Sequence, residues 1–448
     1  MNIVIIGGVA AGAKAAAKIK RLLPDSSVKI YTDDTHVSYS SCGLPYYIEG
    51  NFEDYRTLLV RSPEEFKQSG VDVFLEHKVT KILPQNKEIQ LENGETVPYD
   101  KLIIATGARP KIPDIKGING ANNIFTIRRI EDGIAIRDKM RSSKRAVILG
   151  SGYIGLEILE AFVKNGLQVD LIEHNDNIMP RLDSDMAEII RVRRKSSAYK
   201  NFHIHLSDTI SEVKEVSDKL LITTENGEEI ETDFLVIASG VVPNSELAKE
   251  AGIKVGETGA IWVNKLMRTS IEDIYACGDC AEKTHIVSGK KVWIPLGSTA
   301  NKEGRCAAIN AAGGYCEFEG VLGSTVTRCL STTIAMTGLT EKEAQNVGFS
   351  PVSTIITKHD KVAFMPEASE MTIKIVADKV TGLLLGAQAV GSIGADKRIN
   401  TLTTALLAHL TVQEFGNNDI TYAPPYSTTI DPLLDAMNIL CKKINRIC

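Results

Sequence analysis

The sequence predicts an α/β protein in which two parallel-sheet domains are followed by a C-terminal α+β domain. Two parts of the chain predict the sheets, because a buried strand, a glycine-rich turn and a helix follow one another at the N-terminus and again near residue 150. From about residue 321 the sequence changes to β-rich runs followed by helices, which is typical of an α+β domain. At 448 residues the chain is long enough for two or three domains.

The composition is that of an ordinary globular protein, with 43% hydrophobic and 24% charged residues. A net charge of −5 and the lack of a Lys/Arg tract argue against nucleic acid as a partner. No apolar run approaches the ~18 residues that a membrane span needs. The start, MNIVIIGG, lacks the basic region and cleavage site of a signal peptide. We therefore expect a cytoplasmic protein that binds neither nucleic acid nor membrane.

The first glycine turn has the pattern of a nucleotide cradle. Residues 2–6, NIVII, form a β-branched run of the kind buried in a parallel sheet, and the Ala-rich stretch AKAAAKIKRLL is predicted to be a helix. The turn between them contains Gly7, Gly8 and Gly12, while Val9 stands where the usual pattern has a middle glycine. Such glycines let the backbone approach a pyrophosphate, whose charge the helix N-terminus favours.

Later segments are predicted to complete the same nucleotide site. The strand VKIY ends just before Thr32 and Asp33; either is placed to bind a ribose, and the sequence does not decide between them. The strands KLIIATGARP and DFLVIASGVVPN each run into a tight turn, which suits a crossing between two nucleotide domains. In TSIEDIYACGDCAE an acidic residue can accept hydrogen bonds from ribityl or ribose hydroxyls, although a simple helix cap is the alternative. The candidates in these turns are Ala105, Thr106, Gly107, Gly240, Gly278 and Asp279.

The second glycine turn is a more complete match. AVILGSGYIGLEILEAF carries Gly150, Gly152 and Gly155 at G-x-G-x-x-G spacing between a strand and a helix. The next strand, VDLIE, ends at Glu173, which has the spacing of a carboxylate that takes both hydroxyls of an adenosine ribose. NADH is favoured over NADPH because a 2′-phosphate would meet this negative charge. The other candidates in the turn are Tyr153 and Ile154.

The stretch 37–50, VSYSSCGLPYYIEG, is predicted to hold the reactive centre, Cys42. A thiol serves redox chemistry as the thiolate, which backbone N–H groups and a helix N-terminus stabilise. Small residues around the sulfur let a substrate approach, and LPYYIEG can open a helix just after it. A lone cysteine in a loop is more often an inert thiol. The prediction therefore depends on the two nucleotide turns, which imply an electron source nearby.

Two other segments are expected to carry no chemistry. Cys277 and Cys280 form a C-x-x-C that resembles a redox pair or half of a zinc site, but no second pair lies at zinc spacing, so we predict no metal. Most of the eight cysteines are expected to be reduced and buried. Residues 187–203 should form a helix followed by a strand, yet RVRRKSSAYKN has little apolar periodicity. We expect an irregular or partly ordered surface segment there.

Taken in order, these segments resemble the pyridine nucleotide-disulfide oxidoreductase family over nearly the whole chain. The ATG, G-x-G-x-x-G, ASG and GD segments fall where that family has them. The resemblance implies two Rossmann-like dinucleotide-binding domains, an FAD domain of residues 1–112 with 236–320 and an NAD domain of residues 113–235. It also implies a dimerisation domain of residues 321–448, and therefore FAD, NADH and a homodimer.

Within the family, the chain looks like the single-cysteine branch, because Cys42 has no partner at C-x-x-x-x-C spacing. Its loop is similar to those of coenzyme A-disulfide reductases and NADH-dependent polysulfide and persulfide reductases. Ala10 stands where the related oxidases and peroxidases have a His, which favours the sulfur reductases. In the tail, Tyr422 and Tyr426 match the coenzyme A-disulfide reductases, whereas Phe364 replaces an expected Tyr and is more like the oxidases.

The resemblance implies that hydride passes from a nicotinamide, with Tyr153 as a lid or a packing residue, to the flavin and that electrons continue to Cys42. Cys42 would alternate between a thiolate and a mixed disulfide with coenzyme A or a persulfide. Tyr422 or Tyr426 from the partner subunit would protonate the leaving thiolate, unless YAPPY is only a rigid interface turn. The positions that match the family's coenzyme A loop are Ser38 and Arg21.

The expected acceptor is therefore a small-molecule disulfide, persulfide or polysulfide, with coenzyme A disulfide as the leading expectation. One alternative is an NADH oxidase that reduces oxygen to water or peroxide. The other is a flavoprotein redox sensor in which oxidation of Cys42 alters the binding of a partner.

Overall fold

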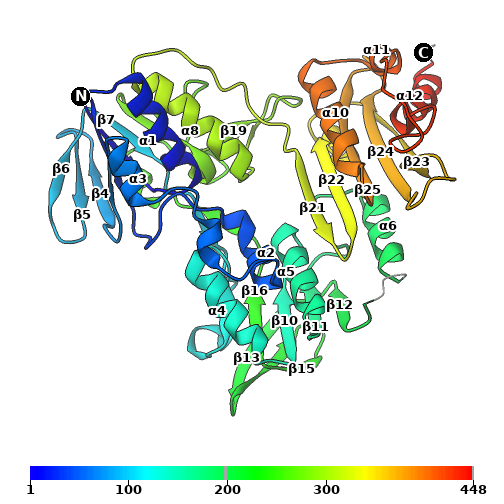
Figure 1. The fold of residues 1–448 in the computed structure, drawn as a ribbon, viewed down its shortest axis with the longest axis horizontal. Coiled ribbons are helices and arrows are strands. Elements are labelled where there is room, and N and C mark those ends of the chain that lie inside the picture. Colours follow the sequence, from blue (N-terminus) through cyan, green and yellow to red (C-terminus); the bar gives the residue numbers. More distant parts are fainter. Residues whose placement is uncertain (196–198, 446–448) are drawn as a thin grey trace.

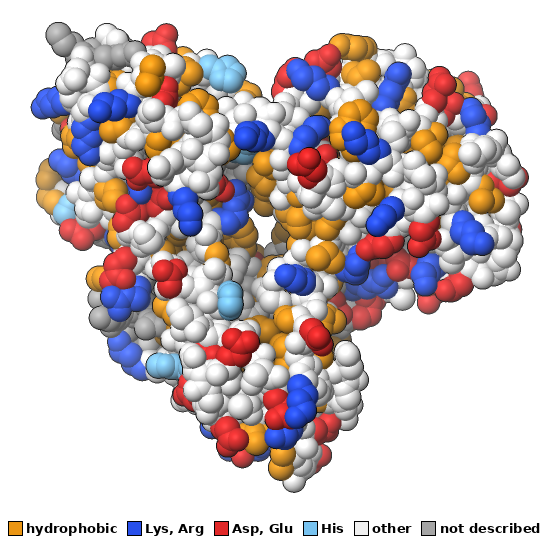
Figure 2. Space-filling model, turned by 180° about the vertical axis from the view of Figure 1, so that it is seen from behind, with side chains coloured by type: hydrophobic (Ala, Val, Ile, Leu, Met, Phe, Trp, Pro, Cys, Tyr) orange, Lys and Arg blue, Asp and Glu red, His pale blue; other side chains and the backbone are white. Residues whose placement is uncertain are grey.

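The computed structural model describes residues 1–195 and 199–445, which fold into three lobes (Figure 1). Two lobes each contain a five-stranded parallel sheet, and the third contains a five-stranded antiparallel sheet. The predicted fold class, two Rossmann-like domains followed by an α+β domain, is confirmed. Seen from behind, the lobes meet around a hollow where hydrophobic side chains are exposed (Figure 2).

The first parallel sheet has the strand order β18-β7-β1-β2-β3, so it joins segments from both ends of the first 280 residues. Its strands are β1 (Asn2–Ile6), β2 (Ser27–Tyr31), β3 (Val71–Phe74), β7 (Lys101–Ile104) and β18 (Ile274–Ala276). Helices α1 (Ala10–Leu22) and α8 (Gly297–Ala311) pack together so closely that a Cβ on Gly304 would lie 2.3 Å from the Ala11 carbonyl oxygen.

Shorter elements surround this sheet. After the Cys42 loop, three strands form a small antiparallel sheet. These strands are β4 (Val79–Leu83), β5 (Glu88–Leu91) and β6 (Thr96–Pro98). The other short elements are α2 (Leu44–Glu49), α3 (Pro63–Gln68), α7 (Glu246–Glu250), β19 (Lys283–Thr284) and β20 (Lys291–Val292).

The second parallel sheet has the order β12-β11-β10-β16-β9. Its strands are β9 (Ile124–Thr126), β10 (Arg145–Leu149), β11 (Gln168–Glu173), β12 (Phe202–Leu206) and β16 (Phe234–Ile237). It carries helices α4 (Ile130–Arg141) and α5 (Tyr153–Lys164), and a small sheet of β13 (Ile210–Val216), β14 (Lys219–Thr224) and β15 (Glu229–Thr232). The NAD domain predicted from the sequence ends at residue 235, but β16 of this sheet continues to Ile237. The residue limits of the domains stay a prediction.

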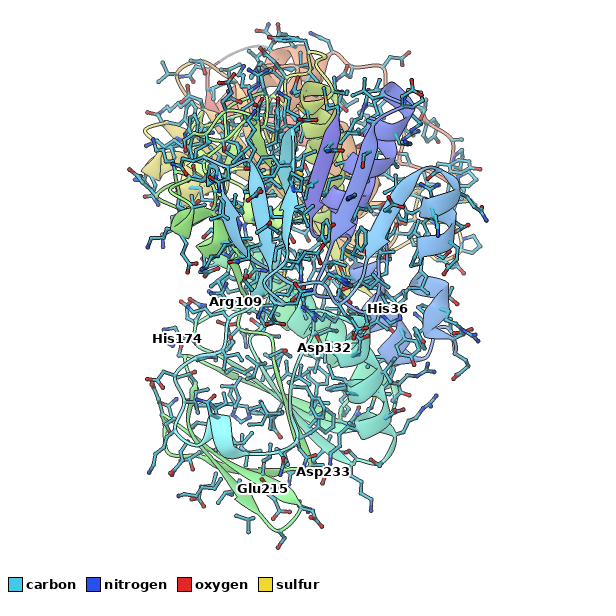
Figure 3. All side chains as sticks on the ribbon, turned by 90° about the vertical axis from the view of Figure 1, so that its left-hand side faces the viewer. His36, Arg109, Asp132, His174, Glu215 and Asp233 are labelled. Atoms are coloured by element: carbon cyan, nitrogen blue, oxygen red, sulfur yellow. The ribbon has the colours of Figure 1, made fainter. Side chains whose placement is uncertain are left out.

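Two antiparallel strands connect the first two lobes, as the turns in the sequence indicated. They are β8 (Ala108–Pro110) and β17 (Val241–Pro243). In the view of Figure 3 the first lobe lies above the second, and Arg109, His36 and Asp132 lie where the two meet. Glu215 and Asp233 lie in the part of the second lobe that is farther from this junction (Figure 3).

Helix α6 (Ser184–Lys195) corrects one expectation from the sequence. The irregular segment predicted within residues 187–203 is wrong up to residue 195, and residues 196–198 lie outside the described part of the chain. Of its side chains up to residue 193, Met186, Ala187 and Ile190 are buried. At its first turn, Lys374 from the third lobe lies 2.7 Å from Asp185, so packing and charge from distant residues stabilise a helix that local propensity does not predict.

The third lobe contains the antiparallel sheet in the order β21-β22-β25-β24-β23, with helices on the same lobe (Figure 1). Its strands are β21 (Thr325–Cys329), β22 (Thr332–Gly338), β23 (Pro351–His359), β24 (Glu370–Asp378) and β25 (Leu384–Gly391). Its helices are α9 (Glu341–Asn346), α10 (Ala395–Leu407), α11 (Val412–Gly416) and α12 (Pro432–Lys443). Among the described residues of all three lobes, no helix has the length and apolar character to cross a bilayer.

Candidate active site

The first glycine turn has the geometry of an anion cradle. Gly7 adopts φ +98°, and a Cβ there would lie 2.2 Å from the Ala105 carbonyl oxygen. A Cβ on Gly12 would lie 1.9 Å from the Gly7 oxygen, so only glycine allows α1 to start this close to β1. Val9 caps α1 without a side-chain hydrogen bond, and the first turn contains no acid. The N–H groups of this turn therefore fit a pyrophosphate.

The second glycine turn repeats this arrangement. Gly150 adopts φ +104°, and a Cβ on Gly155 would lie 2.0 Å from the Gly150 oxygen. Gly152 is the N-cap of α5 and has open space where a side chain would stand. The backbone at this turn is thus accessible to a ligand, whereas the corresponding position of the first turn carries the half-buried side chain of Val9. Both turns have the form that a dinucleotide needs.

Glu173 lies at the end of β11, beside the second turn, and is buried. One carboxylate oxygen accepts hydrogen bonds from the Ser151 N–H at 2.8 Å and hydroxyl at 2.7 Å. The other accepts from the Asn175 N–H at 2.9 Å and side-chain amide at 2.6 Å. Burial opposes ionisation, but these hydrogen bonds lower the pKa of Glu173. The predicted ribose ligand is therefore a fixed anion that already orders its own turn.

The corresponding position of the first turn is built differently. Thr32 is buried, and its hydroxyl accepts a hydrogen bond from the Asp34 N–H at 3.3 Å. Asp33 is exposed, and its carboxylate lies 2.6 Å from Arg129 at the start of α4. Asp33 is thus already paired with a residue of the second lobe. The choice between Thr32 and Asp33 as the ribose ligand stays open.

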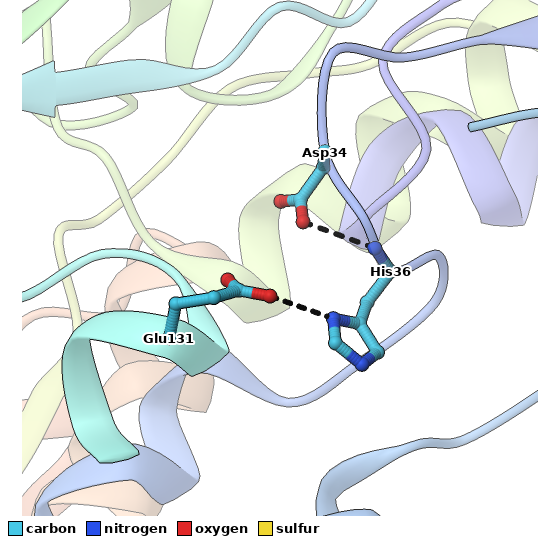
Figure 4. Close-up of side chains that lie close together, drawn as sticks. All are labelled: Asp34, His36 and Glu131. Atoms are coloured by element: carbon cyan, nitrogen blue, oxygen red, sulfur yellow. Dashed lines mark hydrogen bonds and ion pairs between the residues drawn. The ribbon is translucent and has the colours of Figure 1, made fainter. Parts of the chain in front are cut away.

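A third group joins the same two lobes (Figure 4). The Nδ1 atom of His36 lies 3.1 Å from Glu131, and the His36 N–H donates to Asp34 at 3.1 Å. Ligand atoms of these three side chains lie within 4.8 Å of one another. The second oxygen of Asp34 accepts from the Tyr39 hydroxyl at 2.7 Å. The group is therefore a cross-lobe hydrogen-bond network, and we assign it no metal.

The turn at Gly278 and Asp279 presents an unpaired carboxylate oxygen. Asp279 Oδ1 is buried and has no hydrogen-bond partner within the described chain, whereas Oδ2 faces Arg128 at 3.5 Å. An orphaned buried acceptor of this kind needs a donor. It fits the hydroxyls of a bound ribityl or ribose chain, as the sequence predicted. Arg128, which the sequence did not indicate, comes from the segment before α4 and reaches across the lobes to this turn.

Two fully buried charges hold this turn in place. Glu303 accepts a hydrogen bond from the Gly278 N–H at 2.7 Å, and Lys283 donates to the oxygens of Gly278 and Ala281 at 3.0 Å. The Lys283 ammonium lies 3.4 Å from the Glu303 carboxylate. Both side chains are inaccessible to solvent. Neither was predicted, because the pair forms only when α8 packs beneath the turn.

Cys42 lies in the one-turn 3₁₀ helix Ser41–Gly43, directly before α2; the residue is exposed and its thiol is free. The N-terminus of α8 approaches it, since a Cβ on Gly297 would lie 3.7 Å from the sulfur. The first turn of α8 contains no acid and no side-chain cap. The sequence predicted that the helix after Cys42, which is α2, would lie next to the sulfur. The structure adds a second and longer helix, α8, whose N-terminus faces the sulfur although it begins some 255 residues later.

The electrostatics of Cys42 differ from the expectation. The surrounding protein, followed by the charges of Glu157 and Asp279, raises the pKa of the Cys42 thiol. Arg128 and a hydrogen bond with Ser41 act in the opposite direction. The predicted net stabilisation of the thiolate is therefore wrong for the chain alone, because desolvation and two carboxylates outweigh Arg128 and the hydrogen bond with Ser41.

Glu157 on α5 is the main acidic neighbour of the sulfur, and the sequence gave no role to it. Burial raises its pKa to about 7, while hydrogen bonds from Thr327 and Tyr46 act against the shift. The Thr327 hydroxyl donates to Glu157 at 3.0 Å. Tyr46 follows Cys42 by one helical turn. Glu157 therefore connects the cysteine segment, the second nucleotide helix and β21 of the third lobe.

The remaining predicted residues lie around these features. Tyr153 donates or accepts a hydrogen bond with Thr325 of β21 at 2.7 Å, so its ring is held by the third lobe; the neighbouring Ile154 is 36% exposed. Thr106 donates to the Asn244 oxygen at 2.7 Å at the crossing strands. Gly240 lies in the same crossing, where its oxygen accepts from the Lys111 N–H at 2.9 Å. Gly107 approaches Arg128, whose Nη2 would lie 2.8 Å from an added Cβ.

The proposed substrate residues are spread over a larger area. Ser38 adopts φ +52°, and its N–H donates to the Gly8 oxygen at 2.9 Å, at the first turn. Arg21 is near the far end of α1, eleven residues after Ala10, which corresponds to about 16 Å. Within the chain, Arg21 donates to the Ala17 oxygen and is otherwise exposed. Only an elongated ligand can contact both Ser38 and Arg21.

The tail residues do not meet Cys42 within one chain. Tyr422 and Tyr426 lie between α11 and α12, which Figure 1 shows on the opposite side of the molecule from the N-terminal lobe. They are 47% and 79% exposed, and Phe364 is 78% exposed. Cys277 and Cys280, in contrast, are buried, and the Cys280 thiol donates to the Cys277 oxygen at 3.3 Å. The C-x-x-C is thus a packed turn below Asp279.

Comparison with known proteins identifies this architecture. The family model "Pyridine nucleotide-disulphide oxidoreductase" matches residues 1–304, and the model of that family's dimerisation domain matches residues 327–433. The NAD(P)H sulfur oxidoreductase (CoA-dependent) of Pyrococcus furiosus is 38% identical over 445 residues, which cover 98% of this chain and 99% of that protein. The NADH oxidase of Methanocaldococcus jannaschii is 32% identical over 453 residues, which cover 99% and 100%.

Among solved structures, an NAD-dependent persulfide reductase from A. fulgidus is similar to this chain with a TM-score of 0.96 and 37% identity. The similarity covers 99% of this chain and 84% of that one. Sequence and structure thus agree over both nucleotide lobes and the third lobe. The chain belongs to the pyridine nucleotide-disulphide oxidoreductase family and is an NAD(P)H-dependent flavoprotein oxidoreductase, for which the family implies FAD.

Proposed function

We propose that this protein passes electrons from NADH through FAD to Cys42, and from Cys42 to a disulfide, persulfide or polysulfide that carries coenzyme A. The observation that carries the proposal is the free thiol of Cys42, an exposed residue whose sulfur lies at the N-terminus of α8, 3.7 Å from where a Gly297 Cβ would stand. A Cβ at position 297 would already be in van der Waals contact with the sulfur, so glycine leaves that space free for a ligand.

The chain's own residues suit the two cofactors. The first glycine turn would hold the FAD pyrophosphate, and Asp279 would accept from its hydroxyls through the orphaned Oδ1. The second turn and Glu173 would hold NADH, and the negative charge of Glu173 disfavours the 2′-phosphate of NADPH. When bound, FAD would take a hydride from NADH and supply an electron pair to sulfur.

Cys42 performs the sulfur chemistry by exchange. Its thiolate attacks one sulfur of the acceptor, which forms a mixed disulfide and releases the other sulfur as a thiolate. Two electrons and one proton then cleave the mixed disulfide and return the Cys42 thiolate and one small thiol. Arg128 favours the thiolate, and the Glu157 carboxyl, with its pKa of about 7, can hold a proton beside it at neutral pH.

Coenzyme A is the proposed carrier of the acceptor sulfur. The P. furiosus relative is named a CoA-dependent sulfur oxidoreductase, and the A. fulgidus structure is named a persulfide reductase. Coenzyme A is long enough to contact Ser38 near the first turn and Arg21 about 16 Å away along α1. In a homodimer, the exposed Tyr422 or Tyr426 of one protomer would reach the site of its partner and protonate the leaving thiolate.

An NADH oxidase is the second candidate. It is favoured by the M. jannaschii relative, which is named an NADH oxidase, and by Phe364, which stands where a proton-donating Tyr is expected. The two functions differ in the acceptor that reoxidises the enzyme. A redox sensor without turnover is a weaker candidate, because the complete second glycine turn and Glu173 serve repeated binding of NADH.

The test compares acceptors in one preparation of the purified holoenzyme. NADH oxidation is measured without oxygen in the presence of coenzyme A disulfide or coenzyme A persulfide, and then in air without a sulfur acceptor. The proposal predicts a sulfur-dependent rate well above the oxygen-dependent rate. Oxygen consumption comparable with the best sulfur rate would establish the oxidase instead. An intact-mass measurement without reductant should also detect a coenzyme A adduct that Cys42→Ala lacks.

A further inference from the structure

Two cysteines outside the nucleotide sites lie against each other at the end of α8. Cys306 belongs to the helix and is 1% exposed, and its sulfur lies 3.0 Å from the backbone oxygen of Cys316. Both thiols are free. Burial, followed by a side-chain hydrogen bond with Cys316, raises the pKa of the Cys306 thiol. Two thiols in direct contact are an uncommon arrangement for a chain with eight cysteines spread over 448 residues.

Asn310 fixes this arrangement. Its side-chain amide donates to the Cys316 oxygen at 2.7 Å and to the Cys306 sulfur at 3.5 Å. Its side-chain oxygen accepts from the Cys316 N–H at 2.8 Å. Because Asn310 is itself 2% exposed and also donates to the Leu266 oxygen at 2.9 Å, the two cysteines are held together by a buried network. Their proximity is therefore a built feature of the fold.

The two thiols differ in their access to solvent. Cys316 is partly exposed, and the residues around it from Gly313 to Glu319 are mostly exposed. Cys306 lies beneath it and is closed to solvent. This asymmetry suits a two-step exchange, in which the accessible sulfur reacts with the small disulfide and the protected neighbour then displaces the adduct.

We propose that Cys306 and Cys316 form a second redox-active pair, which closes to a disulfide by exchange with low-molecular-weight disulfides. The Cys316 thiolate attacks the disulfide R–S–S–R, forms Cys316–S–S–R and releases one RS⁻. The Cys306 sulfur then attacks the Cys316 sulfur, and its proton passes to the second RS⁻ as that thiolate leaves. Two protein thiols and one small disulfide thus give one protein disulfide and two small thiols, so no further oxidant is needed.

The second step sets the conditions for closure. A buried thiol attacks slowly, because little of it is ionised at neutral pH. Closure is therefore expected when small disulfides accumulate, and excess small thiol should reverse it. The bond would fasten the segment after α8 to the helix whose opposite end approaches Cys42 at Gly297. The pair would thus be oxidised when reductant is scarce, without taking part in turnover.

The chain offers a direct test, because cleavage after Arg305 and Arg328 yields a peptide, residues 306–328, that contains both cysteines and no other. The folded holoenzyme of Cys42→Ser is treated with oxidised glutathione, without NADH. It is then alkylated under denaturing conditions and digested with trypsin. This background prevents capture of the reagent at Cys42. Since no turnover is involved, the result does not depend on the proposed function.

The expected product is peptide 306–328 lighter by two hydrogen atoms and resistant to alkylation until it is reduced. Cys306→Ser should stop at a glutathione adduct on Cys316, and Cys316→Ser should leave Cys306 free for alkylation. Ser at position 306 can keep the hydrogen bond from Asn310, and Cys306→Ala provides a second variant if the hydroxyl disturbs the core. Two results in the protein that keeps both Cys306 and Cys316 would overturn the proposal. One is a stable glutathione adduct on Cys316 with Cys306 alkylated, and the other is a peptide 306–328 that glutathione leaves unchanged.

Discussion

The buried pair of Lys283 and Glu303 is predicted to decide whether the first lobe retains its flavin. Lys283→Met removes the ammonium, so Glu303, whose pKa burial already raises to about 7, is left 0% exposed beside the Asp279 turn either as an uncompensated charge or as an acid that must bind a proton. At 3.4 Å, with an effective dielectric of about 20, the lost attraction is roughly 5 kcal/mol. Loss of one partner of a buried pair costs about 3–5 kcal/mol. This is a large part of the roughly 5–15 kcal/mol that stabilises an ordinary domain.

The assay is unfolding in urea, followed by the fluorescence of released flavin, so that it reports on the first lobe of a three-lobed chain. Lys283→Met should release flavin at a much lower urea concentration than the wild type. Lys283→Met combined with Glu303→Gln should recover most of the loss, because the amide oxygen can still accept from the Gly278 N–H without a buried charge. If Lys283→Met released flavin at the wild-type midpoint, or if the double variant were the less stable of the two, the electrostatic reasoning would be refuted.

Three further predictions concern titratable side chains of the second lobe: Glu157 on α5, His205 on β12 and Glu173 on β11. Glu157→Gln removes a carboxyl with a pKa of about 7 beside Cys42, so the pH midpoint for alkylation of Cys42 should fall; an unchanged midpoint would exclude an effect of Glu157 on the sulfur. A hydrogen bond from His205 to Asp170 raises the pKa of His205 in the folded protein. The protonated imidazole therefore stabilises the fold fully below the pKa of an unfolded histidine, about 6.5, and this stabilisation is lost as the pH rises through the folded pKa. The melting temperature of the wild type should therefore fall more steeply above that pH than the melting temperature of His205→Gln, and parallel curves would contradict this assignment. Glu173→Ser should reduce the ratio of kcat/KM for NADH over NADPH by about tenfold, which corresponds to ~1.4 kcal/mol; an unchanged ratio would show that another residue selects the cofactor.

Local patterns in the sequence were sufficient for the nucleotide turns. Each turn is specified by contacts within a short stretch: Gly12 must approach the Gly7 oxygen, and Gly155 must approach the Gly150 oxygen. The carboxylate of Glu173 follows at a spacing set by one helix and one strand. Such short-range geometry appears directly in the spacing of residues, which is why both turns, and with them the fold class, were predicted correctly.

Contacts between residues far apart in the chain could not be predicted from the sequence. Arg128 meets Asp279 across 151 positions, and Glu157 reaches the cysteine segment from a different lobe. Burial of the thiol, followed by the charges of Glu157 and Asp279, raises the pKa of Cys42 against the expectation, and Arg128 acts in the opposite direction. The extent of helix α6 was underestimated for a related reason, since Lys374 stabilises its first turn from a separate sheet. No local pattern marks these partners, so tertiary packing overrides what the segments prefer alone.

The central claim is that electrons leave the flavin through Cys42. It is tested most directly by stopped-flow measurement of Cys42→Ser without oxygen, in two mixing steps. The account predicts that NADH reduces the flavin of the variant at the wild-type rate, because the nucleotide turns are intact. On addition of coenzyme A disulfide, the reduced flavin of the variant should then persist while that of the wild type is reoxidised. Reoxidation of both at the same rate would contradict the account.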